Sequence, residues 1–317
     1  MASIQFSKYQ GLGNDFIALD NRDGSYDLTN EMRQRMCDRR FGIGADGILE
    51  IRSSKSSHFS LLYFNADGRA GSLCGNGCRC AVAFAWSLGI DGSAPRSQNE
   101  ANKLPVYKFE ASDGVHEGGV LGSDITENGD ENFIYFVNFQ DVLLTNIKIY
   151  PNGDLFLDTG SPHHVRFVSR DVDVIDVLTE GKELRYGLYG EKGSNINFVS
   201  MKIDNKTVEK DKILQVRTYE RGVEDETLAC GTGAVAVAIS DFVRKLNYNQ
   251  KNHEEAMAVP SDLKSLNGKA VSQCISTRGG KLTVDFIIEY KEGSAVFTKI
   301  QLSGYAKHVF DGVYPLK

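Results

Sequence analysis

The stretch Cys74-Gly-Asn-Gly77 opens the apolar run Cys80–Trp86, and Cys230-Gly-Thr-Gly233 opens a second apolar run, Ala234–Ile239. The two copies of this pattern stand about half a chain length apart in 317 residues. Helices with almost no polar face need to be enclosed by other elements rather than lie on the surface. The repeated cysteine therefore predicts two matched thiols, each at the mouth of a buried helix.

Strand-like segments surround both expected helices. They alternate polar and apolar residues or form short apolar runs separated by Gly-containing turns, as in Ile4–Tyr9, Phe59–Phe64, Leu214–Tyr219 and Leu282–Tyr290. Two further helices are expected, one capped by Thr29 and running through Arg40, and a short one beginning within 172–178.

This organisation predicts an α+β fold of two pseudo-symmetric domains. Each would be a mostly antiparallel or mixed sheet wrapped around a central apolar helix, with the active site in the cleft between them. We expect residues 1–138 to form the half with Cys74, completed by a C-terminal strand at 304–317, and residues 139–303 to form the half with Cys230.

Composition excludes several classes of protein. A net charge of −6 argues against nucleic-acid binding, which usually requires a basic surface. The sequence has no run of eighteen apolar residues and no basic, then apolar, leader, so neither a membrane span nor a secretory signal is expected. We therefore expect a cytoplasmic protein whose six cysteines are reduced.

A cysteine at a helix start has a defined chemistry. The first turn of a helix carries N–H groups without helical partners and the positive end of the helix dipole. A thiol there has a lowered pKa, and the same N–H groups can bind a carboxylate. Two such thiols facing one α-carbon suit inversion of an amino acid without a cofactor, because one removes the α-proton and the other protonates the opposite face.

The flanking motifs resemble the diaminopimelate epimerase family along nearly the whole chain. The matching segments are Gly11–Phe16, Gly42–Gly47, Phe64–Gly68, Cys74–Gly77, Ser194–Ile196, Tyr219–Gly222, Glu226–Gly233 and His308–Gly312. The resemblance implies cofactor-independent epimerisation of LL-2,6-diaminopimelate to the meso isomer, which supplies lysine and peptidoglycan-precursor biosynthesis. It also implies a homodimer.

The same resemblance implies roles for individual residues. Cys74 and Cys230 correspond to the acid–base pair, Glu220 to an acidic residue that contacts a substrate ammonium group and assists catalysis, and His163 to a histidine near the cysteines. The remaining expected substrate ligands are Asn14, Asn65, Gly75, Asn76, Ser161, Asn195, Arg221, Gly231 and Thr232. No cofactor and no metal are expected.

Three positions depart from the family pattern. Ser161 stands where the family often has asparagine, Gly47 stands where some members have a glutamine ligand, and 223–226 is one residue longer and more acidic.

Other interpretations remain open at this point. A proline racemase-like enzyme would share the fold and the paired cysteines, although Asn65 and Glu220-Arg221 would be superfluous for a small cyclic substrate. A phenazine-type isomerase lacks the cysteine pair. A non-catalytic cysteine-rich module held by zinc or disulfides is the alternative from another class, with Cys74, Cys78 and Cys80 as its sulfurs.

Two local patterns are interpreted structurally. Gly42–Gly47 matches a dinucleotide-binding pattern but precedes a strand instead of following one, so we interpret it as a turn. His163 and His164 are neighbours on an expected strand and should face opposite ways, with one near the site. Cys37, Cys78, Cys80 and Cys274 are interpreted as core residues.

Overall fold

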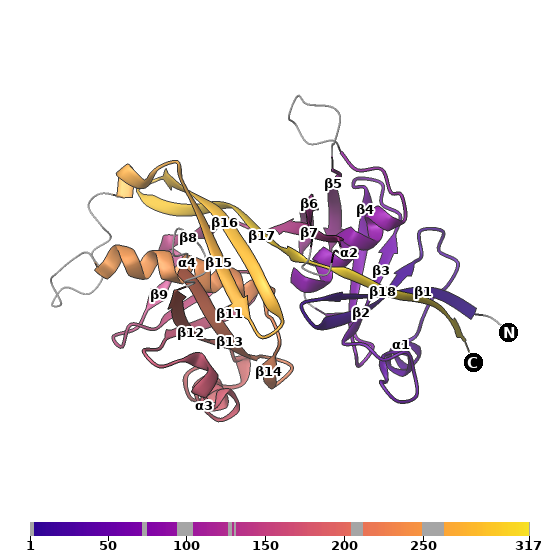
Figure 1. Cartoon of the computed structure of the whole chain (residues 1–317), viewed down its shortest axis with the longest axis horizontal. Helices are drawn as coiled ribbons and strands as arrows, with labels where there is room; N and C mark the ends of the chain where they lie inside the picture. The colour runs from indigo at the N-terminus through magenta and orange to yellow at the C-terminus, as the bar shows by residue number, and fades with distance from the viewer. Residues whose placement is uncertain are drawn as a thin grey trace. The chain divides into compact units, whose positions relative to one another are not determined.

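The computed structural model describes residues 3–71, 75–93, 104–125, 129, 131–203, 212–248 and 263–316. The chain divides into two compact units (Figure 1). Unit 1 contains residues 1–138 and 303–317, and unit 2 contains residues 139–302. The α+β class expected from the sequence is confirmed, because each unit combines a mixed sheet with few helices.

Unit 1 is a mixed sheet in which the C-terminal strand lies beside the N-terminal one. The strands pair in the order β18, β1, β2, β3, β4, β5, β6, β7, antiparallel except for β2–β3 and β4–β5. Their bounds are β1 Ser3–Gly11, β2 Asn14–Asp20, β3 Gly47–Arg52, β4 Phe59–Asn65, β5 Val106–Ala111, β6 Gly114–Ile125, β7 Glu131–Asn138 and β18 Lys307–Pro315.

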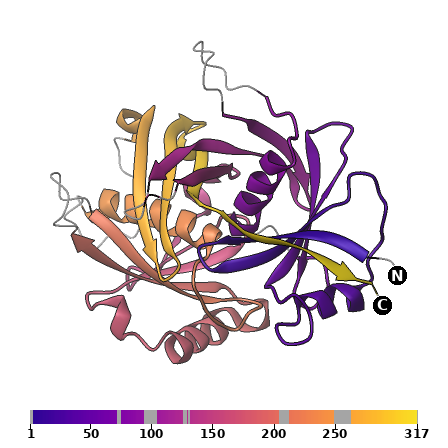
Figure 2. The same ribbon diagram turned by 45° about the vertical axis from the view of Figure 1, so that its right-hand side comes forward.

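Helix α2, Gly75–Ser87, is the centre of unit 1. It contacts strands from both ends of the sheet order, including β18, β1, β6 and β7, so the sheet curves around it (Figures 1 and 2). Every residue from Gly75 to Ala85 is buried. Burial on all sides explains why the sequence of this helix has almost no polar face.

Helix α1, Asn30–Cys37, begins as expected, but the prediction that it continues through Arg40 is wrong. The Thr29 hydroxyl accepts a hydrogen bond from the Met32 amide and caps the first turn. At the other end, the Asp38 carboxylate accepts hydrogen bonds from the amides of Arg40 and Phe41 at 2.7 and 2.8 Å. This side chain replaces the helical partners of those amides, so the helix stops.

Unit 2 holds the second apolar helix, α4 Gly231–Tyr248, which contacts β10, β11, β12, β15 and β16. Strand β11 pairs parallel with β12, and β13 pairs antiparallel with β12 and parallel with β15. The strand bounds are β8 Val142–Leu143, β9 Lys148–Ile149, β10 Leu155–Asp158, β11 Pro162–Phe167, β12 Asn195–Ile203, β13 Lys212–Glu220, β14 Asp225–Thr227, β15 Lys269–Thr277, β16 Gly280–Lys291 and β17 Ser294–Tyr305. The last three residues of β17 belong to unit 1.

The other α-helix described in unit 2 is longer than expected. A helix does begin within 172–178, as predicted, but it is α3 Val177–Tyr189, with 13 residues, and the 3₁₀ turn η3 Val172–Val174 precedes it. Asp176 caps α3 by accepting a hydrogen bond from the Thr179 amide. The other 3₁₀ turns among the described residues are η2 Leu144–Asn146, η4 Gly190–Lys192 and η5 Leu263–Leu266.

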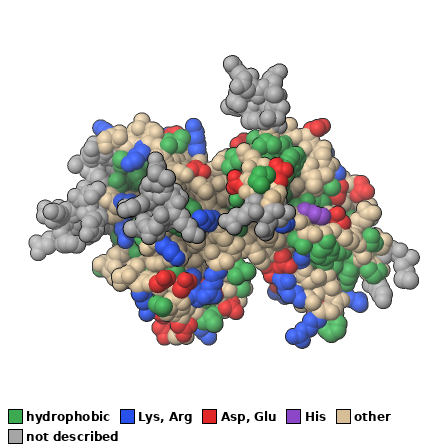
Figure 3. Space-filling view, viewed as in Figure 1, with side chains coloured by type: hydrophobic (Ala, Val, Ile, Leu, Met, Phe, Trp, Pro, Cys, Tyr) green, Lys and Arg blue, Asp and Glu red, His purple; other side chains and the backbone are tan. Residues whose placement is uncertain are grey.

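Acidic and basic side chains alternate over the visible face of the described residues in Figure 3, in keeping with a net charge of −6. Among the helices described, none is both long and apolar enough to cross a membrane.

Candidate functional site

In unit 1, two expected substrate ligands lie at the same end of β2 and β4, the strands on either side of β3. Asn14 begins β2, and β2 runs parallel to β3 with Phe16 opposite Gly47. Gly47 in turn lies opposite Asn65, the last residue of β4. A Cβ added at Gly47 would come within 2.5 Å of the Phe64 carbonyl and 2.7 Å of the Tyr63 ring, so this position has no room for a longer side chain.

The side-chain amide of Asn14 is held by a network of charged side chains. Its Nδ2 donates to the Asp46 carboxylate at 2.6 Å, and Arg39 bridges Asp46 and Asp15. Lys8 pairs with Asp15 at 2.7 Å. Burial alone would raise the pKa of Asp15, but hydrogen bonds from Arg39 and Lys8 outweigh it and lower the pKa to about 2. Asn14 is thus oriented by Asp46, which Arg39 links to Asp15.

The mouth of α2 is formed by Gly75 and Asn76, both buried. Arg79, one turn along the helix, is fully buried and donates to the Asn76 side-chain oxygen at 2.7 Å and to the Gly75 carbonyl at 3.3 Å. Cys74, the predicted catalytic thiol of this half, lies outside the described residues.

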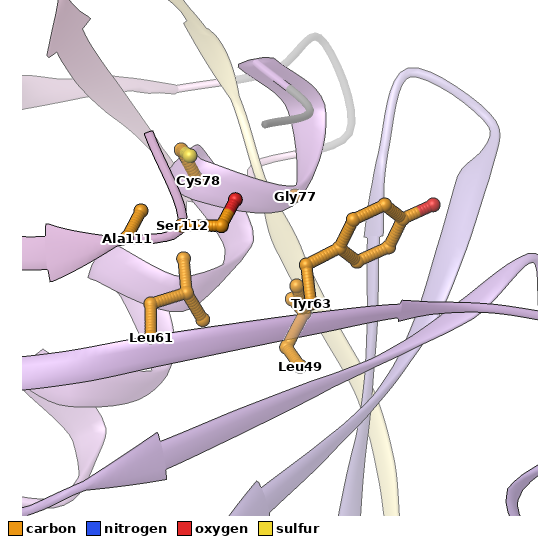
Figure 4. A pocket seen from close by; sticks show the side chains of 7 residues that line it. All are labelled: Leu49, Leu61, Tyr63, Gly77, Cys78, Ala111 and Ser112. Carbon is orange, nitrogen blue, oxygen red and sulfur yellow. The ribbon is translucent and has the colours of Figure 1, made fainter. Parts of the chain in front are cut away.

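A small pocket lies beneath the same helix turn (Figure 4). It is lined by Leu49, Leu61, Tyr63, Gly77, Cys78, Ala111 and Ser112. Because these walls are mostly apolar, the pocket belongs to the packing of α2 against β3 and β4 rather than to a polar ligand site. The placement of Cys78 here agrees with its interpretation as a core residue.

In unit 2, three expected ligands are joined directly. The Asn195 side-chain oxygen accepts from the Arg221 backbone amide at 2.9 Å, and its Nδ2 donates to the Ser161 hydroxyl at 2.9 Å. Asn195 therefore fixes the turn that carries Arg221 against the segment before β11. Arg221 is exposed and donates from Nη1 to the Lys192 carbonyl at 3.3 Å, so its guanidinium reaches solvent.

His163 lies beside the thiol of unit 2. Its Nε2 is 2.9 Å from the Thr232 hydroxyl, and that hydroxyl is 3.5 Å from the Cys230 sulfur. Complete burial, reinforced by the charge of Arg221, lowers the pKa of His163 to about 3, so the ring is neutral at physiological pH. His164 faces the other way, toward Asp154 at 3.0 Å and the Tyr189 hydroxyl at 2.8 Å.

Glu224 holds the turn that follows β13. Its carboxylate accepts from Arg185 at 2.7 Å, from the Gly222 amide at 2.9 Å and from the Tyr219 hydroxyl at 3.2 Å. Its own amide donates to the Glu220 carbonyl at 2.8 Å. Glu224 has a positive φ of 59°, a conformation that costs a side-chain-bearing residue energy and that these contacts stabilise.

The structure thus brings the unit 2 residues into one connected group. Ser161 and the Arg221 amide are each hydrogen-bonded to Asn195, and Cys230 and His163 each lie within hydrogen-bond distance of the Thr232 hydroxyl. Asn195 stands opposite His163 in the β11–β12 register. Sequence reasoning did not single out Asn197 and Glu224, which support this group, nor Asp46, which holds Asn14 in unit 1. A buried amide in the otherwise apolar stretch Ile196–Val199 was the available signal for Asn197.

The mouth of α4 can bind an anion and hold a reactive sulfur. Because α4 begins at Gly231, the amides of its first turn have no helical carbonyl to bond and can serve a carboxylate. Cys230 directly precedes this turn, where the helix dipole favours a thiolate. Among the described residues, no group of three His, Cys, Asp or Glu side chains is placed to hold a metal ion.

Known proteins match this chain over most of its length. The sequence profile of diaminopimelate epimerase matches residues 6–102 and 155–297. The diaminopimelate epimerase of Flavobacterium psychrophilum is 39% identical over 97% of this chain and 99% of its own. That of Chlorobaculum tepidum is 42% identical over 73% and 81%, and that of Aquifex aeolicus is 32% identical over 98% and 97%.

Solved structures of low sequence identity share the fold. A phenazine biosynthesis protein of the PhzF family from Bacillus anthracis superposes with a TM-score of 0.62 at 15% identity, covering 100% of both chains. A probable proline racemase from Agrobacterium radiobacter superposes with a TM-score of 0.57 at 10% identity, covering 99% of this chain and 93% of its own. These likenesses establish the two-domain architecture, whereas the sequence matches establish the relationship: the chain belongs to the diaminopimelate epimerase family.

Proposed function

We propose that this protein epimerises LL-2,6-diaminopimelate to meso-diaminopimelate without pyridoxal phosphate or a metal, in the supply of lysine and peptidoglycan precursors. The observation that carries the proposal is the Cys230–Thr232–His163 group at the mouth of α4, in a chain that belongs to this family. The sulfur there is buried, is beside a helix N-terminus, and is next to a neutral histidine.

The proposed reaction is a proton exchange at one α-carbon. One cysteine, as thiolate, removes the α-proton and becomes a thiol, and the electron pair left on carbon is delocalised into the adjacent carboxylate. The thiol of the other cysteine then donates its proton to the opposite face and becomes a thiolate. Cys74 and Cys230 form this acid–base pair, so no external oxidant, reductant or cofactor enters the balance.

The carboxylate at the reacting carbon is assigned to the amides of the two helix mouths. Gly75 and Asn76 in α2 and Gly231 and Thr232 in α4 would supply these donors, which stabilise the developing negative charge. The buried helix starts also exclude water, which strengthens the same interactions.

The far end of the substrate is assigned to the polar side chains of both units. Asn14, Asn65, Asn195 and Arg221 suit a carboxylate and an ammonium group, and Glu220 suits an ammonium group. The Ser161 hydroxyl already accepts a hydrogen bond from Asn195, so we assign it to holding that amide rather than to direct contact.

Conversion of the pure LL isomer tests the proposal. Purified protein under thiol reductant should produce the meso isomer until the two interconverting forms reach equilibrium, as measured by chiral chromatography. L-proline and trans-4-hydroxy-L-proline serve as controls for the proline racemase-like alternative and should remain unchanged. Conversion of either control, with none of LL-diaminopimelate, would assign the protein to that alternative.

Two further properties are proposed with this function. We place the enzyme in the cytoplasm, because its thiols must stay reduced to act. We also expect a homodimer, which sedimentation or light scattering would detect as twice the 35.0 kDa chain mass.

A further inference from the structure

A chain of buried side chains leads from strand β13 to the sulfur of Cys230. Its members are Thr218, Asn197, His163 and Thr232, all described and all less than about a tenth exposed. Successive polar atoms are separated by 2.9, 3.2, 2.9 and 3.5 Å. All of its members lie within unit 2.

The direction of the hydrogen bonds follows from the first links. Asn197 Nδ2 donates to the His164 backbone carbonyl at 2.9 Å. Because a carbonyl only accepts, this contact fixes the orientation of the Asn197 side-chain amide. Its side-chain oxygen accepts from the Thr218 hydroxyl at 2.9 Å. The second Nδ2 hydrogen therefore points to His163 Nδ1 at 3.2 Å.

The histidine is thereby set in one tautomer. A neutral imidazole whose Nδ1 accepts must carry its hydrogen on Nε2, and this nitrogen faces the Thr232 hydroxyl at 2.9 Å. Since the Thr232 oxygen accepts this hydrogen, its own hydrogen is available to another acceptor. The Cys230 sulfur lies 3.5 Å away.

We infer that Asn197 is a positioning residue that fixes the Nε2–H tautomer of His163, so that the Thr232 hydroxyl donates to the Cys230 sulfur and favours its thiolate. Resting on the proposed function, this makes Cys230 the thiolate in the enzyme at rest and Cys74 the thiol. His163 then acts as a fixed neutral donor to the Thr232 hydroxyl and does not itself exchange a proton with the substrate.

The glycine after Thr232 belongs to the same arrangement. A Cβ at Gly233 would come within 2.6 Å of the Asn197 side-chain oxygen, so glycine allows α4 to lie directly against Asn197. The Thr159 hydroxyl donates to the Thr232 carbonyl at 2.9 Å and holds the first helix turn in place.

The charge that acts on His163 is that of Arg221, and a positive charge there also favours a thiolate. His164 faces Asp154 and Tyr189 on the other side of β11. The buried His163 stays neutral over the range from pH 5 to 10, so a titration observed at Cys230 in that range is not that of His163.

The test measures the ionisation of Cys230 without any substrate. Iodoacetamide labels thiolates, and the tryptic peptide 222–244 contains Cys230 as its one cysteine, so mass spectrometry follows this residue alone. The pH dependence of its labelling is compared in the native protein and in the pair Thr232→Val and Thr232→Ser. Valine keeps the shape of threonine but lacks the hydroxyl, whereas serine keeps the hydroxyl.

We expect Thr232→Val to raise the midpoint of labelling by about one pH unit, the size of one hydrogen bond to a charged group. Thr232→Ser should stay close to the native midpoint. Thr298→Val is the matched control, because Thr298 is another buried threonine of unit 2 and donates to the Ile287 carbonyl on β16. It should leave the midpoint unchanged.

Equal midpoints in all four proteins, or equal shifts in the serine and valine variants, would overturn the inference. A second measurement does not depend on any variant folding. Nitrogen-15 spectra of the His163 ring in the native protein at neutral pH should show the hydrogen on Nε2 and a bare Nδ1. A hydrogen on Nδ1 would contradict the assigned direction of the hydrogen bonds between Asn197 and Cys230. Because neither assay uses diaminopimelate, failure here is distinguishable from failure of the proposed reaction.

Discussion

At the residue scale, the site depends on where one sulfur is placed. Cys230 is 9% exposed, directly precedes α4 and is linked through Thr232 to a neutral His163. The sequence predicted this position from the Cys-Gly-x-Gly pattern, because a thiol at a helix mouth has a defined chemistry. It did not predict Asn197, since a single amide within a strand carries no signal for the tautomer of a neighbouring histidine.

Replacing Cys230 with serine should abolish most of the activity. A hydroxyl is a far weaker acid than a thiol, so we expect kcat to fall by about 10²–10⁴-fold. Thermal unfolding should be nearly unchanged, because the two side chains are similar in size. Cys274→Ser is the control: Cys274 lies on β15, is half-buried, and should retain activity within about twofold. Comparable losses in both variants would contradict a specific role for Cys230.

Gly233→Ala should destabilise the protein and impair catalysis together. The added Cβ would meet the Asn197 oxygen at 2.6 Å and the Cys230 sulfur at 3.3 Å, which we expect to cost about 1–3 kcal/mol. The control is Gly187→Ala in α3, where an added Cβ meets nothing within 4 Å. That change should stabilise by about 0.5–1 kcal/mol because alanine favours helix. Urea unfolding measures the change in stability of both variants. An unchanged unfolding free energy in Gly233→Ala would contradict the close contact between α4 and Asn197.

At the element scale, the two apolar helices were predictable and α3 was largely not. Apolar side chains all around α2 and α4 match their enclosure by strands. Helix α3 contains Gly181, which weakens the helical pattern. The structure gives the reason for this glycine, because a Cβ there would lie 2.5 Å from the Tyr219 side chain. Close packing of α3 on β13 thus overrides local propensity, and packing of this kind is invisible in the sequence.

The contact between α3 and the Glu220–Gly222 turn should matter for substrate binding. Glu224→Ala removes the acceptor for Arg185 and for the Gly222 amide, so the turn that carries Arg221 loses its anchor. We expect kcat/KM to fall about tenfold, mainly through KM. Glu180→Ala is the control, since Glu180 is on α3, as Arg185 is, and pairs with the exposed Arg170. An unchanged KM in Glu224→Ala would contradict the anchoring role.

The network behind His164 should make unit 2 sensitive to acid. Burial alone would raise the pKa of Asp154, but hydrogen bonds from His164, Arg166 and Asn152 lower it to about 2. A folded-state pKa below the unfolded value of about 3.9 gives stability that is present above pH 4 and is lost as the pH falls toward 2.

Asp154→Asn tests this dependence. The variant should be less stable at pH 7 by about 2–3 kcal/mol, and its unfolding free energy should fall less between pH 5 and pH 3 than that of the native protein. Asp158→Asn, at an exposed carboxylate that accepts from the Gly160 amide, is the control for removing a charge nearby. Parallel curves for the native and Asp154→Asn proteins would contradict the contribution of this carboxylate.

At the scale of the whole molecule, the chain closes unit 1 with its last strand. Residues Ser3–Gln10 of β1 pair with Lys307–Pro315 of β18, and the core of unit 1 includes Ala306 from the end of the chain. The repeated pattern in the sequence indicated two halves of similar construction. It carried no information on supporting networks such as Asp46–Arg39–Asp15, because the packing of β2 against the segment after α1 brings these side chains together.

The central claim is inversion at one α-carbon by exchange of its proton, and solvent deuterium reports this step most directly. LL-diaminopimelate incubated with reduced protein in deuterium oxide should yield the meso isomer with deuterium at the inverted α-carbon alone, as read by proton NMR and mass spectrometry. The other α-carbon should keep its hydrogen, because the far end of the substrate is held by ligands and does not react. Deuterium at both centres, or none with verified free thiols, would contradict the account.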